Sequence, residues 1–360
     1  MKKLISLLCL LMAAAMLLTA GALADEYGNL DFRYALQVEN FTEDGLALFQ
    51  ARNGLYGFVD TDDDVVIAPQ YESAGSFGSG LAPVSMGGLW GYIDTAGTLV
   101  LPYQWQAARS FSEGLAAVHD GSGWGYIDPT GALAIPCQFK SAYAFEGGIA
   151  YIGSSYIDRV GNPVDLNAMS PAAGIFTFEK DPDGYYPTYH VYCNGAFALT
   201  VSGSNKYFEL DDSDIQPVQG AENLWVISEQ YLYNSATNQV LMRGMSSIST
   251  VCSEGMILVR RDGDNYFVDV NGRMVIAPVN AAYDFSCGYA LVELQATEYD
   301  QAGYPLNVYT YIDTAGEESY YVYDRFERAF PLVNGYAIVK DDGEWQVISE
   351  YYLRRGGAGC

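Results

Sequence analysis

The chain has 360 residues, of which 50% are hydrophobic and 17% are charged, so it can bury a core and is not a disordered polyelectrolyte. Its formal net charge of −26 makes nucleic-acid phosphates and anionic membrane surfaces unfavourable partners. Basic proteins, neutral glycans and divalent cations remain possible, as does a charge that serves only solubility. Thirty tyrosines and 38 glycines are typical of many short strands joined by tight turns.

The first 24 residues have the three parts of a secretory signal peptide. Two lysines precede an apolar run from Leu4 to about Leu18, and Ala22-Leu23-Ala24 provides a small-residue cleavage site. The apolar run is shorter than the ~20 residues that a transmembrane helix needs, which favours cleavage after Ala24 over a retained anchor. We therefore expect an exported protein, secreted or held at the cell surface, without an integral membrane segment after cleavage.

A unit of about 34 residues recurs through most of the remaining sequence. Its clearest markers are Asp60, Asp94 and Asp128, which are evenly spaced by 34 residues. Two successive copies contain Trp-Gly-Tyr-Ile-Asp, a turn that ends in glycine, and a later phenylalanine. The signature residues are Trp90, Gly91, Tyr92, Asp94, Gly97 and Phe111 in one copy, Trp124, Gly125, Tyr126, Asp128, Gly131 and Phe145 in the next, and Phe77 in the copy before them.

Each part of the unit has a structural interpretation. Alternation in the first strand places Trp90, Tyr92 and Asp94 on one face, and the intervening glycine leaves room for a close neighbour. Aspartate at the first place and glycine at the fourth predict a tight turn. A second strand is expected to stop at proline. Tyr71, Ala74 and Phe77 are spaced by three residues, which predicts one helical turn with one face inward. A third strand is expected after this turn.

The sequence therefore predicts an all-β tandem array whose units each contain three short strands and a helical turn. Stacked units share a core that one unit cannot form alone. We expect a solenoid-like superhelix, with a propeller-like ring as the alternative, because propeller blades usually need four strands. Regular repeats are predicted over 25–165 and 251–350, degenerate repeats or an inserted region over 166–250, and a flexible tail over 351–360.

The repeated phrase Gly-x-Trp-Gly-Tyr-Ile-Asp-x-x-Gly, with Ile-x-Pro and Phe-x-x-Gly-Leu-Ala-x-Val after it, resembles the WG-repeat (KWG repeat) family of bacterial proteins. The resemblance is close over 53–152 and has substitutions over 251–340. It implies an exported or surface-associated repeat protein that binds a partner. It implies no common reaction or cofactor and brings no catalytic residues.

Catalytic and metal-binding patterns are weak in this sequence. His119 and His190 lack the spacing of a metal site or a catalytic relay, so packing or loop roles are favoured. The acidic run from Asp60 to Asp64 is not followed by the glycine and glutamate that an EF-hand requires. A plain turn is favoured, with Asp63 at the glycine place. We predict no catalytic residues, no metal site and no cofactor.

Five cysteines remain after signal cleavage, in no recognisable framework. A disulfide between Cys252 and Cys287, which lie in corresponding parts of neighbouring repeats, is left open. Cys360 in the tail is expected to be a free thiol or an incidental residue.

The aromatic residues suggest a binding function. Those at fixed repeat positions, such as Trp90 and Trp124, are predicted to form the core, whereas unrepeated tyrosines are expected to be exposed contacts. These are Tyr185, Tyr186, Tyr189, Tyr320 and Tyr321, with Tyr323 beside them. The favoured function is a non-catalytic scaffold that binds a protein or a cell-envelope glycan. The alternatives are an extracytoplasmic hydrolase with carboxylates in the degenerate centre and a purely structural surface spacer.

Overall fold

The computed structural model describes residues 31–164, 175–182, 186–294, 308–318 and 326–354. The predicted signal peptide, Cys360, and four of the predicted contact tyrosines (Tyr185, Tyr320, Tyr321 and Tyr323) lie outside these residues. Within them, none of the helices has the length and apolar character needed to cross a membrane. The chain divides into two compact units, residues 1–162 with 342–347, and residues 163–341 with 348–360.

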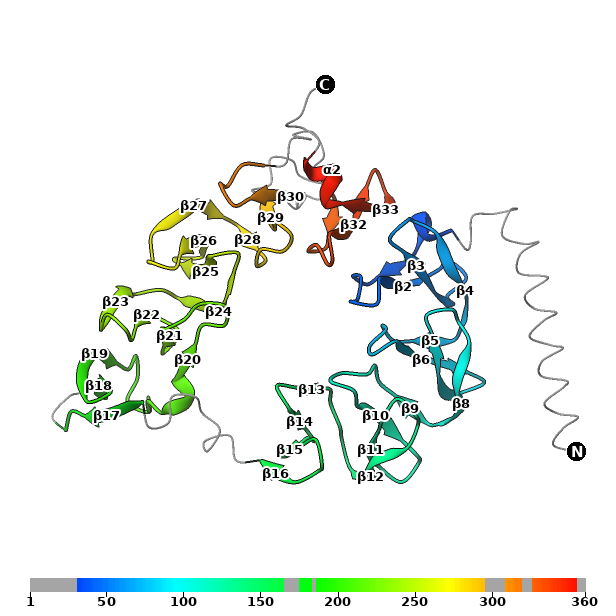
Figure 1. Cartoon of the computed structure of the whole chain (residues 1–360), viewed down its shortest axis with the longest axis horizontal. Helices are drawn as coiled ribbons and strands as arrows, with labels where there is room; N and C mark the ends of the chain where they lie inside the picture. Colours follow the sequence, from blue (N-terminus) through cyan, green and yellow to red (C-terminus); the bar gives the residue numbers. More distant parts are fainter. Residues whose placement is uncertain (1–30, 165–174, 183–185, 295–307, 319–325, 355–360) are drawn as a thin grey trace, which may run out of the picture. The chain divides into compact units, whose positions relative to one another are not determined.

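The described residues are almost entirely β-structure, in nine small antiparallel sheets (Figure 1). Four sheets precede residue 165: β1 (Gln37–Val38), β2 (Leu46–Gln50), β3 (Tyr56–Asp60) and β4 (Val65–Tyr71); β5 (Ser73–Ala74), β6 (Leu81–Met86), β7 (Leu89–Asp94) and β8 (Leu99–Trp105); β9 (Ala107–Ala108), β10 (Ala116–His119), β11 (Trp124–Ile127) and β12 (Leu133–Phe139); and β13 (Phe145–Glu146), β14 (Ile149–Tyr151), β15 (Tyr156–Asp158) and β16 (Pro163–Val164).

Five sheets follow in chain order. They are β17 (Phe176–Lys180), β18 (Thr188–Cys193) and β19 (Ala196–Ser202); β20 (Ile215–Pro217), β21 (Leu224–Ile227), β22 (Tyr231–Asn234) and β23 (Gln239–Met242); β24 (Ser247–Ser253), β25 (Met256–Arg261), β26 (Asp264–Asp269) and β27 (Met274–Val279); β28 (Ala281–Ala282), β29 (Tyr289–Leu294) and β30 (Val308–Asp313); and β31 (Arg328–Ala329), β32 (Tyr336–Asp341) and β33 (Glu344–Ser349). The described helical segments are short: η1 (Phe32–Tyr34), η3 (Asp212–Asp214) and α2 (Glu350–Arg354).

Each of the four sheets before residue 165 has four strands, so the expectation of three strands and a helical turn is wrong for these repeats. The segment expected to be helical contains the short strand β5, which pairs antiparallel with β6. Tyr71 ends the last strand of one sheet, while Ala74 and Phe77 belong to the start of the next, and all three face the same hydrophobic layer. Their spacing of three therefore arises because the chain passes from one sheet to its neighbour.

The strands that contain proline do not stop there, which corrects a second expectation. β8 continues through Pro102, and its register against β7 shifts between the Tyr92–Leu101 and Trp90–Trp105 pairs. β8 is an edge strand of its sheet and is bulged at this point, and these are the places where a β-sheet tolerates proline. β4 and β12 run through their prolines with the same kind of shift.

The glycine of the Trp-Gly pair makes this bulge possible. A Cβ atom on Gly91 would lie 2.6 Å from the Leu101 carbonyl oxygen and 3.0 Å from the Tyr103 nitrogen. Gly57 and Gly125 face bulged backbone in the same way. Backbone atoms of a paired strand cannot move aside as a flexible side chain can, so the repeat requires glycine here.

Neighbouring sheets are joined by a recurring pair of aromatic rings. Tyr92 in β7 contacts Phe111, which precedes β10 of the next sheet, with ring centroids 5.1 Å apart. Tyr126 and Phe145 repeat this contact at 4.9 Å. The pairs Phe58–Phe77 (4.8 Å) and Phe267–Phe285 (4.9 Å) occupy the same positions of other repeats. All eight of these rings are buried.

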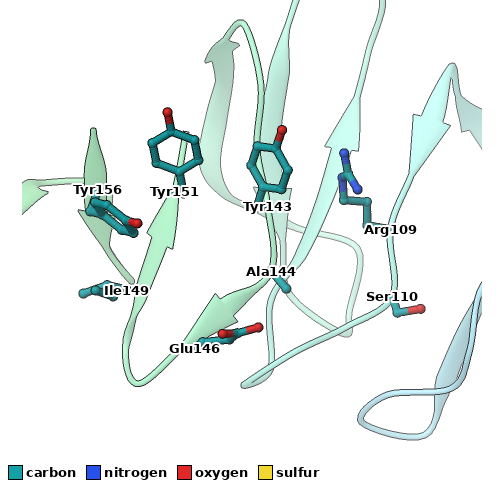
Figure 2. A pocket seen from close by; sticks show the side chains of 8 residues that line it. All are labelled: Arg109, Ser110, Tyr143, Ala144, Glu146, Ile149, Tyr151 and Tyr156. Atoms are coloured by element: carbon teal, nitrogen blue, oxygen red, sulfur yellow. The ribbon is translucent and has the colours of Figure 1, made fainter. Parts of the chain in front are cut away.

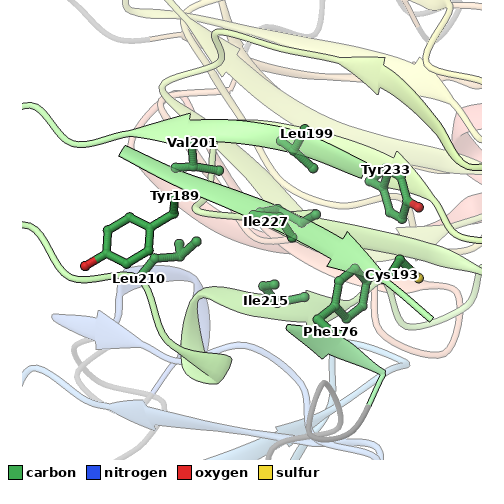
Figure 3. Close-up of a cluster of buried hydrophobic side chains, with 10 residues drawn as sticks. Phe176, Tyr189, Cys193, Leu199, Val201, Leu210, Ile215, Ile227 and Tyr233 are labelled. Atoms are coloured by element: carbon green, nitrogen blue, oxygen red, sulfur yellow. The ribbon is translucent and has the colours of Figure 1, made fainter. Parts of the chain in front are cut away.

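The part of the chain where the signature is weakest also contains antiparallel sheets with a buried core. The sheet β17–β19 contributes Phe176, Val191 and Cys193, and the sheet β20–β23 contributes Ile227 and Tyr233 (Figure 3). Four strands in the order β20-β21-β22-β23 reproduce the arrangement of the regular repeat. These residues therefore preserve the packing of the array without its Trp-Gly signature.

We expect Gly91→Ala to lower the free energy of unfolding by about 1–3 kcal/mol, because the added methyl group meets fixed backbone. Chemical denaturation of the chain would measure this loss. Ala96→Gly, in an exposed turn, is the control and should cost less than about 1 kcal/mol. A Gly91→Ala protein as stable as the wild type would contradict this account of the bulge.

The buried tyrosines predict a loss of stability at alkaline pH. Burial raises the pKa of Tyr71 and of Tyr126 to about 12, above the ~10 of an unfolded chain. Their contribution is therefore complete below pH ~10 and is lost as the pH rises through about 12. Tyrosinate absorbance and circular dichroism, followed together, should show late ionisation that coincides with loss of β-structure. Tyr126→Phe should make the pH dependence less steep. Complete tyrosine ionisation with the β-structure intact would contradict the prediction.

Candidate functional site

The first unit carries a continuous row of aromatic and cationic side chains. The Arg109 guanidinium carbon lies 5.2 Å from the Trp124 ring centroid and 5.1 Å from that of Tyr143. Tyr143 lies 5.6 Å from Tyr151, which in turn lies 5.2 Å from Tyr156. Figure 2 shows the Arg109, Tyr143 and Tyr151 side chains extending in the same direction; Arg109 follows β9, Tyr143 precedes β13, and Tyr151 ends β14.

These side chains line a hollow that we call the aromatic groove, with a volume of about 580 Å³. It is lined by Arg109, Ser110, Tyr143, Ala144, Glu146, Ile149, Tyr151 and Tyr156. Tyr143 is 46% exposed and Tyr151 is 38% exposed, so both present ring surface to a ligand. Trp124 lies beside the groove and contacts Arg109.

The repeat places Arg109 and Tyr143 at equivalent positions, each just upstream of the phenylalanine that packs against the preceding sheet. The Arg109 amide donates to the Ala117 carbonyl at 2.9 Å, and the Tyr143 amide donates to the Tyr151 carbonyl at 3.1 Å. These hydrogen bonds fix the backbone of both residues, while their side chains remain outside the core.

The hydroxyl groups of two buried tyrosines also hold the backbone of Arg109 and Tyr143. Tyr92 donates to the Arg109 carbonyl oxygen at 2.9 Å, and Tyr126 donates to the Tyr143 carbonyl oxygen at 2.9 Å. Burial raises the pKa of both tyrosines, so both hydroxyl groups keep their protons at neutral pH. The repeat core thus positions the residues of the groove.

Tyr151 and Tyr156 form a directly opposed pair on β14 and β15. In the two preceding sheets the equivalent pairs are Pro83–Tyr92 and Ala117–Tyr126, in which the first residue is small or compact. Those pairs are buried, whereas Tyr151 and Tyr156 are both partly exposed. A pair that forms core in other repeats therefore forms part of the groove here.

The predicted signature residues have structural positions in the repeat. Tyr92 and Tyr126 are fully buried, and Trp90 and Trp124 are half-buried beside the same hydrophobic layers. Among the ring contacts of the described residues, one joins a predicted signature residue to a lining residue of the groove. It is the contact between Trp124 and Arg109. Sequence reasoning missed Arg109, Tyr143, Tyr151 and Tyr156. The available signal was partial: Tyr151 stands where the preceding copies have Pro83 and Ala117, and Arg109 and Tyr143 occupy a position that varies between copies. Tyr156 keeps the repeat tyrosine and gave no such signal.

The turn aspartates share one backbone setting. The Asp94 Oδ1 atom accepts from the amides of Ala96 and Thr98 at 3.0 and 2.8 Å, and Gly97 has φ +79°. In five other turns an aspartate Oδ1 atom likewise accepts from the amides two and four residues later. These aspartates are Asp60, Asp128, Asp158, Asp269 and Asp313.

The acidic run from Asp60 to Asp64 forms one of these turns, with Asp63 at the glycine place and φ +68°. Hydrogen bonds led by the Thr130 hydroxyl lower the pKa of Asp128, which keeps that turn acceptor ionised. Across the described ranges there is no group of three or more His, Cys, Asp or Glu side chains suited to a metal ion.

One predicted contact residue is wrong. Tyr189 is only 7% exposed and lies in the core shown in Figure 3, because alternate residues of β18 face inward. Tyr186 is 47% exposed, as a contact residue would require. Cys252 and Cys287 are both free thiols, so the structure contains no disulfide between them.

Both histidines lie in strands and contact aromatic rings. His119 ends β10, where its ring centroid is 5.4 Å from that of Trp124 and its Nδ1 accepts from the Gly121 amide. The His190 Nδ1 atom lies 3.1 Å from the Thr200 Oγ1 atom across two paired strands, and its ring is 6.2 Å from that of Phe197.

The five best-preserved copies of the repeat match a known family. Residues 56–90, 90–121, 124–152, 267–295 and 309–345 match the sequence model of the WG containing repeat. The chain carries WG repeats. The resemblance predicted from the Trp-Gly-Tyr-Ile-Asp phrase is confirmed, and two of the matched segments, 90–121 and 124–152, together include every lining residue of the groove except Tyr156.

Solved structures with low identity resemble the chain. A eukaryotic initiation factor has 12% identity and a TM-score of 0.44, with 84% of this chain and 89% of that one covered. The WD40 domain of SCAP from fission yeast has 7% identity and a TM-score of 0.33, with 89% and 92% covered. The β-propeller domain of Cps50 (Swd1) from Myceliophteria thermophila has 8% identity and a TM-score of 0.28, with 88% and 96% covered. No curated protein matches the sequence.

We expect Tyr126→Phe to lower the free energy of unfolding by about 0.5–1.5 kcal/mol, because the Tyr143 carbonyl loses its hydroxyl donor. The fold should persist, since phenylalanine occupies this place in the repeats of Phe58 and Phe267. Urea denaturation would measure the difference. Tyr192→Phe removes an exposed hydroxyl that donates to Glu179 and should change stability much less. Equal losses in the two variants would contradict a special role for the inter-repeat hydrogen bond.

Proposed function

We propose that this protein is an exported, non-catalytic WG-repeat scaffold that binds a cell-envelope glycan in the aromatic groove. The observation that carries the proposal is the row of partly exposed rings from Tyr143 to Tyr156. Tyr151 and Tyr156 lie on the paired strands β14 and β15, and the Tyr143 amide donates to the Tyr151 carbonyl. Aromatic faces provide large and rigid contact area for the apolar faces of sugar rings. Sites built on strands also hold their side chains more accurately than sites on loops.

The size of the groove favours a glycan over a folded protein partner. Its volume of about 580 Å³ falls within the range of small-ligand sites, roughly 300–1,000 Å³. A standard protein interface instead buries about 800 Å² on each partner, which is a far larger surface. A saccharide segment of a few units suits the dimensions of the groove better.

The proposed location rests on the N-terminal sequence, in which a basic start, an apolar run and Ala22-Leu23-Ala24 precede the repeats. A secreted or surface-held protein would meet envelope glycans directly. A hydrolase in the degenerate centre and a surface spacer are less well supported, because the groove lies outside that centre and offers partly exposed contact residues.

The arrangement of the sheets is part of the same proposal. Three strands in each unit would favour an open superhelix. The four sheets before residue 165 each have four strands, which supports the alternative, a propeller-like ring, because four is the usual number in a propeller blade.

The proposal predicts that Tyr143→Ala and Tyr151→Ala each weaken glycan binding by about ten-fold or more, since each removes an exposed stacking surface. Chain 25–360 would be screened on an array of defined oligosaccharides, and the affinities of the bound members measured by calorimetry. Tyr283→Ala is a matched control. Its amide donates to the Leu291 carbonyl as that of Tyr143 does to Tyr151, it is 50% exposed, and it does not line the groove.

Absence of any bound oligosaccharide would overturn the proposed function. Binding that Tyr143→Ala and Tyr283→Ala weaken equally would show that the groove is not the recognition surface.

A further inference from the structure

Among the described residues of this strongly acidic protein, Arg109 has no acidic partner. The sequence has 44 acidic residues and only 18 lysines and arginines. None of the ion pairs within the described ranges includes Arg109, and its guanidinium donates no hydrogen bond to any described residue. Glu146 lines the same groove but makes no ion pair with it.

The contacts that Arg109 does make hold its position without occupying its donors. The guanidinium lies over the rings of Trp124 and Tyr143, at 5.2 and 5.1 Å. Cation–π contacts of this kind use the face of the planar group and leave its N–H edge available. The hydroxyl of Tyr92 fixes the backbone of Arg109 through its carbonyl oxygen. The result is a positioned fork of donors beside a row of aromatic faces.

A planar fork of N–H donors matches a carboxylate, which accepts two parallel hydrogen bonds from it. The adjoining rings of Tyr143 and Tyr151 suit the apolar face of a sugar ring. We infer that the aromatic groove recognises a carboxylate-bearing saccharide, whose carboxylate binds Arg109 and whose ring stacks on these tyrosines. This inference rests on the proposed glycan-binding function and names the ligand class.

The charge of the rest of the protein narrows that class further. A net charge of −26, together with Glu146 in the groove, repels a ligand with many negative charges. The groove offers one cation and several aromatic rings, so it suits a single acidic sugar flanked by neutral sugars.

The test compares acid and methyl-ester pairs of short oligosaccharides that each contain a single glucuronic, galacturonic or N-acetylneuraminic acid. Calorimetry with chain 25–360 should show at least one acid that binds ten-fold or more tightly than its methyl ester. Added salt should reduce this difference. Arg109→Gln should remove the difference between acid and ester. Arg109→Lys should retain part of it, because lysine keeps the charge but not the fork.

Arg52→Gln is the matched control. Arg52 is also exposed, and its guanidinium also lies over a ring, 4.9 Å from that of Tyr34, but it is outside the groove. This variant should bind both members of each pair as the wild type does.

The outcomes separate the inference from the proposed function. Equal affinity for acid and ester in every pair that binds would overturn the acidic ligand and leave glycan binding intact. No binding to any saccharide, acidic or neutral, would overturn both. Preferential binding of an acetylated dipeptide with a free carboxylate would assign Arg109 to peptide recognition and overturn the saccharide.

Discussion

The structure depends on one contact, the pairing of an aromatic ring in the third strand of a sheet with a phenylalanine of the next sheet. Each small sheet buries too little surface to be stable alone, so this inter-sheet layer supplies its core. The contact recurs with nearly constant geometry at Tyr92–Phe111 and Tyr126–Phe145. In both copies the tyrosine adds a hydrogen bond to a carbonyl group two residues before that phenylalanine. The ring contact and the hydrogen bond therefore join the same two sheets.

Much of the repeat could be predicted because its signals are local. Alternation, the aspartate turn and the glycine all act within a few residues, and the turn at Asp94 has the predicted acceptor geometry. The strand β5 could not be predicted from spacing alone. A three-residue period is produced equally by a helical turn and by a chain that passes between two sheets, and only the pairing partner β6 separates these cases. Pro102 was read as a strand end, although an edge strand with a bulge tolerates it.

The groove was harder to predict than the core for a related reason. Its residues come from four segments, after β9 and at β13, β14 and β15, and meet only after two sheets have packed together. Residues at repeated positions are easy to recognise in a sequence, but in this protein they form the core. Arg109 and Tyr143 occupy a variable position of the repeat, and Tyr151 replaces a small or compact residue. Such variation also arises in degenerate copies without a binding role. The error at Tyr189 has the same origin, since an unrepeated tyrosine can also face inward.

The backbone geometry at residues 75, 109, 143 and 283 has a consequence for how such arrays diversify. At each of these positions the amide donates to a neighbouring strand, whatever the side chain. Glycine, arginine and tyrosine all occur there without a change in that hydrogen bond. Mutation at this place leaves the architecture intact, and each duplication of the repeat adds one more such place. Exchange of single side chains at this place therefore changes the surface of such an array without changing its fold.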